Sequence, residues 1–410
     1  MGGFRASGRA VGLLRRDGSG QQSTFVELFF DLAVVFTLNR VVTHSVPGLL
    51  GDDPGQRWAS VGRTVLLFVA VMWLWTTTAF ITSRFEPRRA GTQVMLLGST
   101  FAMVLMGTAV AGVFAGGGVV FAVAFVTTQV VRSVVVTVGL RPHRLRRLYG
   151  RISVWFCLAG VLWVGGAIAG GAAVLVWWSV AVVVDLGSAR LGWPVPWLGR
   201  GRTTTWQVAG GHMTDRYSQL LMIALGESIL AVGISFGGHK SGVYETGGLV
   251  VAFATTVLLW RVYFFKAGEL VGEALHASGD PAGWGRKAGF AHAVMVAGIV
   301  ATAIGHKIVQ SSYNPSMGVA WLAMILGGPV LFLAGRSRLE HLVFDRVSRR
   351  RLVAIAALAV ISPLAVRATP LGAATAAALV LLLIAVLDWR NAAGQPAEAA
   401  SPPAPGPGSG

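Results

Sequence analysis

Long apolar stretches alternate with short polar connections along almost the whole chain. A helix that crosses a membrane needs about 20 mostly apolar residues. Twelve stretches of roughly this length are present, and we expect each of them to form a membrane-spanning helix. Their approximate bounds are 25–45, 62–82, 92–112, 116–138, 152–170, 172–188, 216–236, 247–266, 288–309, 317–335, 351–368 and 371–388. The pattern predicts an all-α, polytopic membrane protein with about 12 transmembrane helices.

The two halves of this pattern resemble each other. The second span contains Trp75, the eighth contains Trp260, and a basic pair precedes both the third and the ninth span. Six spans in each half would give two parallel repeats with the same orientation in the membrane. The predicted domains are a basic cytoplasmic tail (1–24), a first six-helix repeat (25–190), a cytoplasmic connection (191–215), a second six-helix repeat (216–390) and a disordered Ala/Pro/Gly/Ser-rich tail (391–410).

The composition agrees with this architecture and excludes several others. Hydrophobic residues make up 54% of the 410 residues and charged residues only 12%. Ordinary soluble proteins carry about 25% charged residues. The proportions therefore exclude a soluble enzyme, a disordered protein and a coiled coil.

The positions of the basic residues predict how the chain is oriented. About 26 of the 34 lysines and arginines lie in the two terminal segments and the even-numbered connections, against about four in the odd-numbered connections. Cytoplasmic loops of membrane proteins carry this excess of positive charge. We therefore expect a multi-pass protein of the cytoplasmic membrane with both termini in the cytoplasm.

The formal charge of +17 points to a partner of opposite charge. Because the basic residues lie between apolar spans, anionic lipid headgroups at the cytoplasmic face are expected to supply that charge, and nucleic acid is not. Cys157 is the only cysteine, so an intrachain disulfide or a cysteine-based metal site is excluded. We expect no metal site and no cofactor.

Two acidic residues in the first span are the first candidates for a functional site. Glu27 and Asp31 are four residues apart and therefore share one face of a helix. Two facing carboxylates can share a proton or hold a cation. The alternative is structural: Glu27 lies near the cytoplasmic interface and pairs with a loop arginine.

The seventh span carries a further carboxylate, Glu227, about twelve residues from its start. A carboxylate at that depth is neutral or paired, and Arg132 and Arg261 are the candidate partners. The alternative is a buried ion pair that only fixes helix packing. His292, which opens the ninth span, and Trp75 and Trp260 complete the candidate binding or coupling residues. No residue is assigned a catalytic role.

Three segments resemble the bacterial low temperature requirement A (LtrA) family. They are Val26-Glu-Leu-Phe-Phe-Asp-Leu-Ala-Val-Val-Phe36, Ala224-Leu-Gly-Glu-Ser-Ile-Leu-Ala-Val-Gly233 and the stretch from Ala291-His292 to Val300. The resemblance covers residues 25–390. The sequence departs from the family pattern at Asn39-Arg40 and at Asp215. It implies a bacterial membrane protein and a link to growth in the cold, and it brings no molecular activity with it.

Three functions remain open from the sequence. The leading hypothesis is a secondary transporter, or proton- or cation-coupled carrier, that moves a small molecule or ion with Glu227 and Asp31 as binding groups. The second is an intramembrane enzyme that acts on a lipid or isoprenoid, with tryptophans near the carboxylates. The third is a structural or sensory membrane protein in which the buried charges fix packing.

Overall fold

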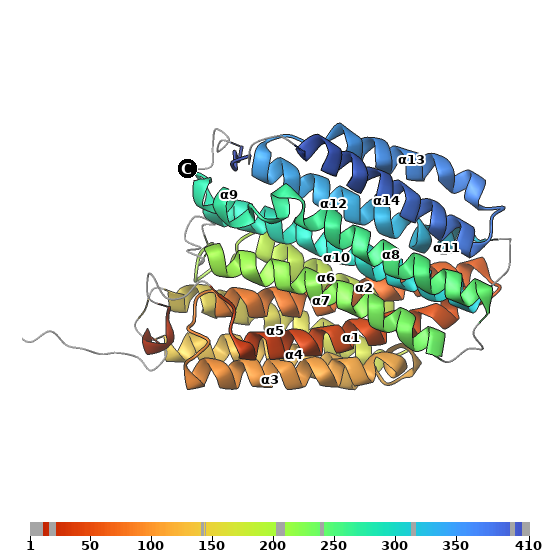
Figure 1. The fold of residues 1–410 in the computed structure, drawn as a ribbon. Coiled ribbons are helices and arrows are strands. Elements are labelled where there is room, and N and C mark those ends of the chain that lie inside the picture. Colours follow the sequence, from red (N-terminus) through yellow and green to blue (C-terminus); the bar gives the residue numbers. More distant parts are fainter. Residues whose placement is uncertain are drawn as a thin grey trace, which may run out of the picture. The chain divides into compact units, whose positions relative to one another are not determined.

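The structure is a computed structural model, and it describes residues 11–15, 22–140, 143, 145–201, 210–237, 242–312, 317–393 and 398–403. Helices joined by short connections make up these ranges, in which the β-structure is limited to two isolated bridges (Figure 1). The all-α class predicted from the sequence is confirmed. The chain divides into two compact units: unit 1 is Met1–Val41 with Val65–Met213, and unit 2 is Val42–Thr64 with Thr214–Gly410.

Unit 1 is a bundle of long helices with buried aromatic residues between them. Its helices α3, α4, α5 and α6 pack in sequence order, α4 against α3 and α5, and α5 against α6 (Figure 1). Its elements are the 3-10 helix η1 (Val11–Leu13), the first part of α1 (Phe25–Leu50), most of α2 (Pro54–Thr82), α3 (Ala90–Ala109), the 3-10 helix η2 (Val110–Ala115), α4 (Gly118–Gly139), α5 (Leu145–Ala169) and α6 (Ala173–Arg190).

Unit 2 contains most of the second half of the chain. In it α10 packs along α12, α14 packs against α8, and α13 lies against α12 and α14 (Figure 1). Its elements are α7 (Gly210–Gly237) from Thr214 onward, the start of this helix with His212 belonging to unit 1, α8 (Val243–Phe264), the 3-10 helix η4 (Lys266–Gly268), α9 (Val271–Ala277), α10 (Pro281–Ser311), α11 (Val319–Ile325), α12 (Gly327–Phe344), α13 (Arg349–Ala365) and α14 (Pro370–Ala392), with the adjoining ends of α1 and α2.

Glycines allow α10 and α12 to approach each other closely. A Cβ atom added at Gly298 of α10 would lie 2.5 Å from the backbone nitrogen of Phe332, and one at Gly328 of α12 would lie 2.6 Å from that of Thr302. Both distances are too short for any side chain. Small residues at such contacts are typical of packed membrane helices, because backbones can then meet directly.

Each of the twelve predicted stretches coincides with a helix, the tenth of them with the pair α11 and α12. Among the described residues, nine helices are long and apolar enough to cross a membrane, and the pair α11 and α12, bent by 43°, adds a tenth. Two of the twelve predicted spans do not meet these criteria. The helix α1 carries three charged residues, Glu27, Asp31 and Arg40, and α13 is short, with 17 residues. The protein is therefore a polytopic membrane protein, while twelve spans in two repeats stays a prediction.

In unit 1, two segments predicted to lie on the same side of the membrane contact each other. In unit 1 the backbone nitrogen of Arg15 donates to Arg84 O, and that of Glu86 donates to Leu13 O, both at 2.8 Å. Burial lowers the pKa of the Arg15 guanidinium from its ordinary value, and the nearby Glu86 carboxylate opposes that effect. The predicted alternation of loops is compatible with these contacts, and the orientation itself stays a prediction.

Candidate functional site

Glu27 lies in the first turn of α1 and is fully buried. The backbone nitrogen and the Oγ1 of Thr24, just before the helix, both donate to Glu27 Oε2 at 2.9 Å. This is half of a capping box, in which a Thr-x-x-Glu pattern satisfies free N–H groups where a helix begins. The other oxygen, Oε1, is 2.8 Å from Nε2 of His212, which is also fully buried. Glu27 is thus both a helix cap and one member of a buried carboxylate–imidazole pair.

Asp31 lies one turn further along α1 and is also fully buried. The indole nitrogen of Trp75, on α2, donates to Asp31 Oδ1 at 3.0 Å. The sequence had singled out both residues as candidates, and the structure brings them together. Since an indole N–H is a neutral donor, this contact holds the carboxylate without adding a positive charge.

Arg132 of α4 contacts the same helix α2 and is 5% exposed. Its guanidinium donates to the hydroxyl oxygens of Thr78 at 2.6 Å and Thr77 at 2.8 Å, and to Gln129 Oε1. Thr78 lies three residues after Trp75, so both are on one face of α2. Within the described part of the chain, the hydrogen-bond acceptors of Arg132 are therefore all neutral. We call Glu27, Asp31 and Arg132, with these partners, the polar cluster of unit 1.

Glu227 is fully buried in α7 of unit 2. Its carboxylate interacts electrostatically with the ammonium group of Lys307, on α10. Lys307 Nζ in turn donates to Thr43 Oγ1 at 2.8 Å. The sequence suggested Arg132 and Arg261 as counter-charges for Glu227, which stays a prediction, and Lys307 is a further cation that interacts with this carboxylate.

His292 belongs to a directed chain of hydrogen bonds in unit 2. Its Nδ1 is 2.8 Å from the carbonyl of Ala288, so Nδ1 carries the proton and Nε2 is an acceptor. Tyr263 OH lies 2.9 Å from that Nε2 and donates to it, and Ser218 Oγ lies 3.3 Å from the tyrosine oxygen. The ring of Tyr217 stacks on the imidazole with 4.7 Å between centroids. The arrangement is a buried hydroxyl–imidazole relay that runs from Ser218 to Ala288.

Two other candidates from the sequence lie apart from these groups. Trp260 is 43% exposed on α8 and packs against Phe264, with 5.7 Å between ring centroids. Arg261 lies near the end of the same helix, with its guanidinium carbon 5.0 Å from the ring centroid of Phe265. Neither has a carboxylate among its described contacts.

Several residues that complete these groups were not identified from the sequence. His212, Tyr263 and Lys307 contact Glu27, His292 and Thr43, respectively. One local signal was available, since Thr24-x-x-Glu27 is a capping-box pattern that places Glu27 at a helix start. The other partners are far apart in the sequence, and no local pattern identifies them. Within the described residues, no group of three or more His, Cys, Asp or Glu side chains could hold a metal ion.

Comparisons with known proteins agree with the motifs in α1 and α7. Residues 22–386 match the family model described as bacterial low temperature requirement A protein (LtrA). The chain is 29% identical, over 337 residues, to a protein of Rhizobium meliloti (strain 1021) that carries the name "Uncharacterized protein RA0937"; the match covers 78% of each chain. No solved structure matches. Since the family model spans well over half of the sequence, this chain belongs to the LtrA family of bacterial membrane proteins.

Proposed function

We propose that this chain is a secondary transporter of the cytoplasmic membrane, with both termini in the cytoplasm, in which buried carboxylates bind a proton or a cation while a small solute or ion moves. The polar cluster of unit 1 carries the proposal. It has two fully buried carboxylates one turn apart on α1, with an imidazole 2.8 Å from the first. Ionisable groups inside membrane helices are costly, and they commonly mark the path of ions or protons.

Each member of the cluster has a chemical role in this proposal. An imidazole nitrogen can both accept and donate a proton, and we assign to His212, whose Nε2 is 2.8 Å from Glu27 Oε1, the exchange of a proton with this carboxylate. Asp31 is the second binding group, one turn along the same helix. Arg132 supplies a fixed positive charge held by neutral oxygens, which suits an anionic group of the solute or a nearby carboxylate. In unit 2, Glu227 and Lys307 form a second group of the same kind.

The test is a flux measurement with a matched pair of variants. Purified protein is reconstituted into liposomes that contain a pH-sensitive dye, and a panel of inorganic ions, amino acids and organic acids is added outside. Asp31→Asn removes one carboxylate charge of the cluster. Asp185→Asn is the control, because Asp185 is also buried and accepts a hydrogen bond from an indole, that of Trp163, at the same 3.0 Å.

The expected result is a solute-dependent pH change in the wild type that falls at least tenfold in Asp31→Asn and stays within twofold in Asp185→Asn. Because both aspartates are buried and accept a hydrogen bond from an indole, the loss of that hydrogen bond alone would affect both variants alike. Equal flux in all three proteins, equal loss in both variants, or no flux above empty liposomes would each contradict the proposal.

A structural role is the second candidate, and one observation favours it. Glu27 accepts two hydrogen bonds from Thr24 and therefore stabilises the start of α1 whatever else it does. If that is its whole role, Glu27→Gln keeps the two hydrogen bonds and leaves any cellular phenotype intact. A cold-growth assay with expression matched to the wild type separates this role from transport, in which the charge itself is needed.

A further inference from the structure

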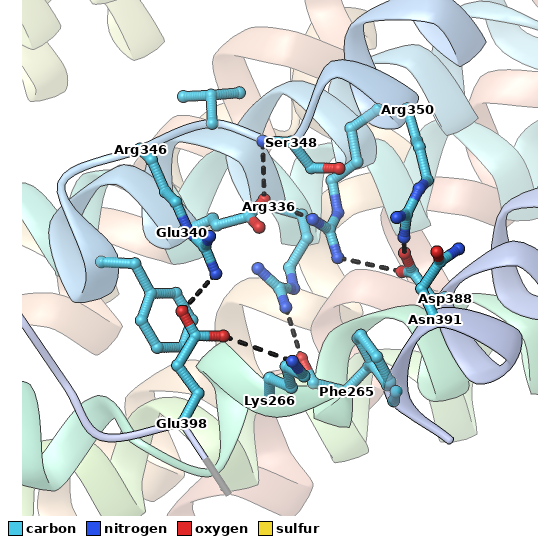
Figure 2. Close-up of a pocket in the computed structure, with 14 residues that line it drawn as sticks. Phe265, Lys266, Arg336, Glu340, Arg346, Ser348, Arg350, Asp388, Asn391 and Glu398 are labelled. Atoms are coloured by element: carbon cyan, nitrogen blue, oxygen red, sulfur yellow. Dashed lines mark hydrogen bonds and ion pairs between the residues drawn. The ribbon is translucent and has the colours of Figure 1, made fainter. Parts of the chain in front are cut away.

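A basic pocket in unit 2 lies outside the groups described above. It has a volume of about 240 Å³, and it lies where the end of α12, the start of α13, the end of α14 and the link after α8 meet (Figure 2). Five cations line it together with three carboxylates. The cations are Lys266, Arg336, Arg346, Arg350 and Arg351, and the carboxylates are Glu340, Asp388 and Glu398.

Two of the carboxylates, Glu340 and Asp388, form ion pairs with two of the arginines. Arg351 pairs with Glu340 and also with Asp388, at 3.2 Å from the latter, and Arg350 reaches Asp388 at 3.1 Å. Arg351 and Asp388 are almost fully buried. These four residues form a closed ion-pair network that makes one wall of the pocket. The other three cations of the lining, Lys266, Arg336 and Arg346, do not belong to this network and can contact an anion in the pocket.

Arg336 is the deepest of those three cations and is 1% exposed. Its Nε donates to Val262 O at 3.0 Å and its Nη2 donates to Phe265 O at 2.6 Å, and Figure 2 shows it pointing toward Phe265. Its Nη1 is buried and has no hydrogen-bond partner among the described residues. A buried guanidinium N–H without an acceptor is unfavourable. An anion that enters the pocket would supply the missing acceptor.

Arg346 and Lys266 hold a carboxylate from the far end of the chain. Glu398 lies between them, 3.2 Å from Lys266 Nζ and in contact with Arg346 (Figure 2). The tail is also held by its backbone, since Ala400 N donates to Glu273 Oε1 at 3.1 Å and Ser401 N donates to Val343 O at 2.8 Å. A carboxylate shared by two cations shows that this part of the pocket accepts an anion.

The two ion pairs of Glu398, with Lys266 and with Arg346, are weak. Arg346 is 62% exposed and Lys266 33% exposed, and ion pairs so open to water contribute little. A phosphoryl group carries more negative charge and more acceptor oxygens than a carboxylate, and arginines bind it through paired hydrogen bonds. It would therefore compete well with Glu398 for the same two cations, and Arg336, which lines the same pocket, offers a third cation.

We propose that this pocket binds a phosphoryl anion, and that Glu398 of the C-terminal tail is an internal occupant which the anion displaces. The phosphoryl group comes either from the headgroup of an anionic lipid or from phosphate free in solution. The loops that form the pocket carry the predicted cytoplasmic excess of positive charge, and cytoplasmic leaflets are rich in anionic lipids. The inference is independent of the transport proposed for unit 1.

The experiment uses the purified full-length protein and two probes. The first is inorganic phosphate, titrated calorimetrically in detergent, and the second is a series of vesicles of phosphatidylcholine with increasing phosphatidylglycerol. The double variant Lys266→Gln/Arg346→Gln removes the two exposed cations, and Glu398→Gln removes the internal competitor. Arg338→Gln is the matched control, since Arg338 is an exposed arginine of α12 that does not line the pocket.

The expected result for at least one probe is a tenfold or greater loss of affinity in the double variant and a several-fold gain in Glu398→Gln, with Arg338→Gln within twofold of the wild type. Binding of phosphate alone identifies a free anion as the ligand, and binding of the phosphatidylglycerol vesicles alone identifies a lipid headgroup. Equal affinity in all four proteins, or no binding of either probe by the wild type, would overturn the proposal. Because the varied side chains are at least a quarter exposed, these variants are expected to fold.

Discussion

The polar cluster of unit 1 and the basic pocket of unit 2 hold their charges in opposite ways. In the cluster, Asp31 is bound by an indole and Arg132 by hydroxyl and amide oxygens. In the pocket, Arg350 and Arg351 are bound by carboxylates, and the chain's own tail brings a third one, Glu398. Asp31 and Arg132 lie within long apolar helices, whereas the pocket lies at helix ends, where water reaches part of it.

The difference follows from the cost of removing charge from water. A dense group of ions inside an apolar bundle would lose more hydration than the ion pairs return. In the contacts described for Asp31 and Arg132, neutral donors and acceptors satisfy the charge without adding further ions. At helix ends the loss of hydration is smaller, so several ions can gather, and the more exposed of them, Lys266 and Arg346, remain exchangeable. Buried charges of the first kind suit the binding of one proton or ion, while the second kind suits a larger anion.

The largest expected effect is on the Glu27–His212 pair. Glu27→Ala would leave the two partly buried donors of Thr24 without an acceptor and the fully buried His212 without its partner, and should lower the free energy of unfolding by about 3 kcal/mol. Thermal unfolding in detergent measures this change. Glu27→Gln is the matched variant, and should lose less than half as much because its amide oxygen still accepts from Thr24. An equal loss in the free energy of unfolding in both variants would show that the two hydrogen bonds from Thr24 do not contribute to stability.

A smaller effect is expected at Arg132, and it separates function from stability. Arg132→Met removes a buried cation whose acceptors, Thr77 and Thr78, also donate to backbone carbonyls of their own helix. The free energy of unfolding should therefore change by only about 1 kcal/mol in either direction, while any flux that depends on Asp31 is lost. The same reconstituted protein serves for both measurements. A loss of stability as large as that of Glu27→Ala would make Arg132 a packing residue.

The smallest effect is expected at the rim of the pocket. Arg346→Gln removes an exposed partner of Glu398, and should change the free energy of unfolding by less than about 1 kcal/mol. Screening by salt should reduce even that difference, so wild type and variant should unfold at the same temperature in 1 M NaCl. A clear difference that persists at high salt would mean that the contact is more buried than its exposure indicates.

Local patterns in the sequence were sufficient for the helices and for one feature of the site. All twelve apolar stretches coincide with helices, and Thr24-x-x-Glu27 marks the start of α1. Trp75 and Asp31 were each a candidate from the sequence, but no local pattern paired them. The hydrogen bond between them, and the lack of a carboxylate among the described contacts of Trp260 and Arg261, depend on how each helix is rotated about its axis. The spans are apolar on most of their surface, so no polar face predicts that rotation.

The sequence alone determined where the helices lie, because in a membrane every helix must satisfy its own backbone hydrogen bonds and needs only a long apolar stretch to do so. It also placed the buried charges on those helices and placed the chain in its family. Only the tertiary structure decided which partners the charges have: His212 for Glu27, Trp75 for Asp31 and the tail residue Glu398 for Lys266 and Arg346. Such pairings join residues far apart in the chain, and they follow from the close packing of helices rather than from any local pattern.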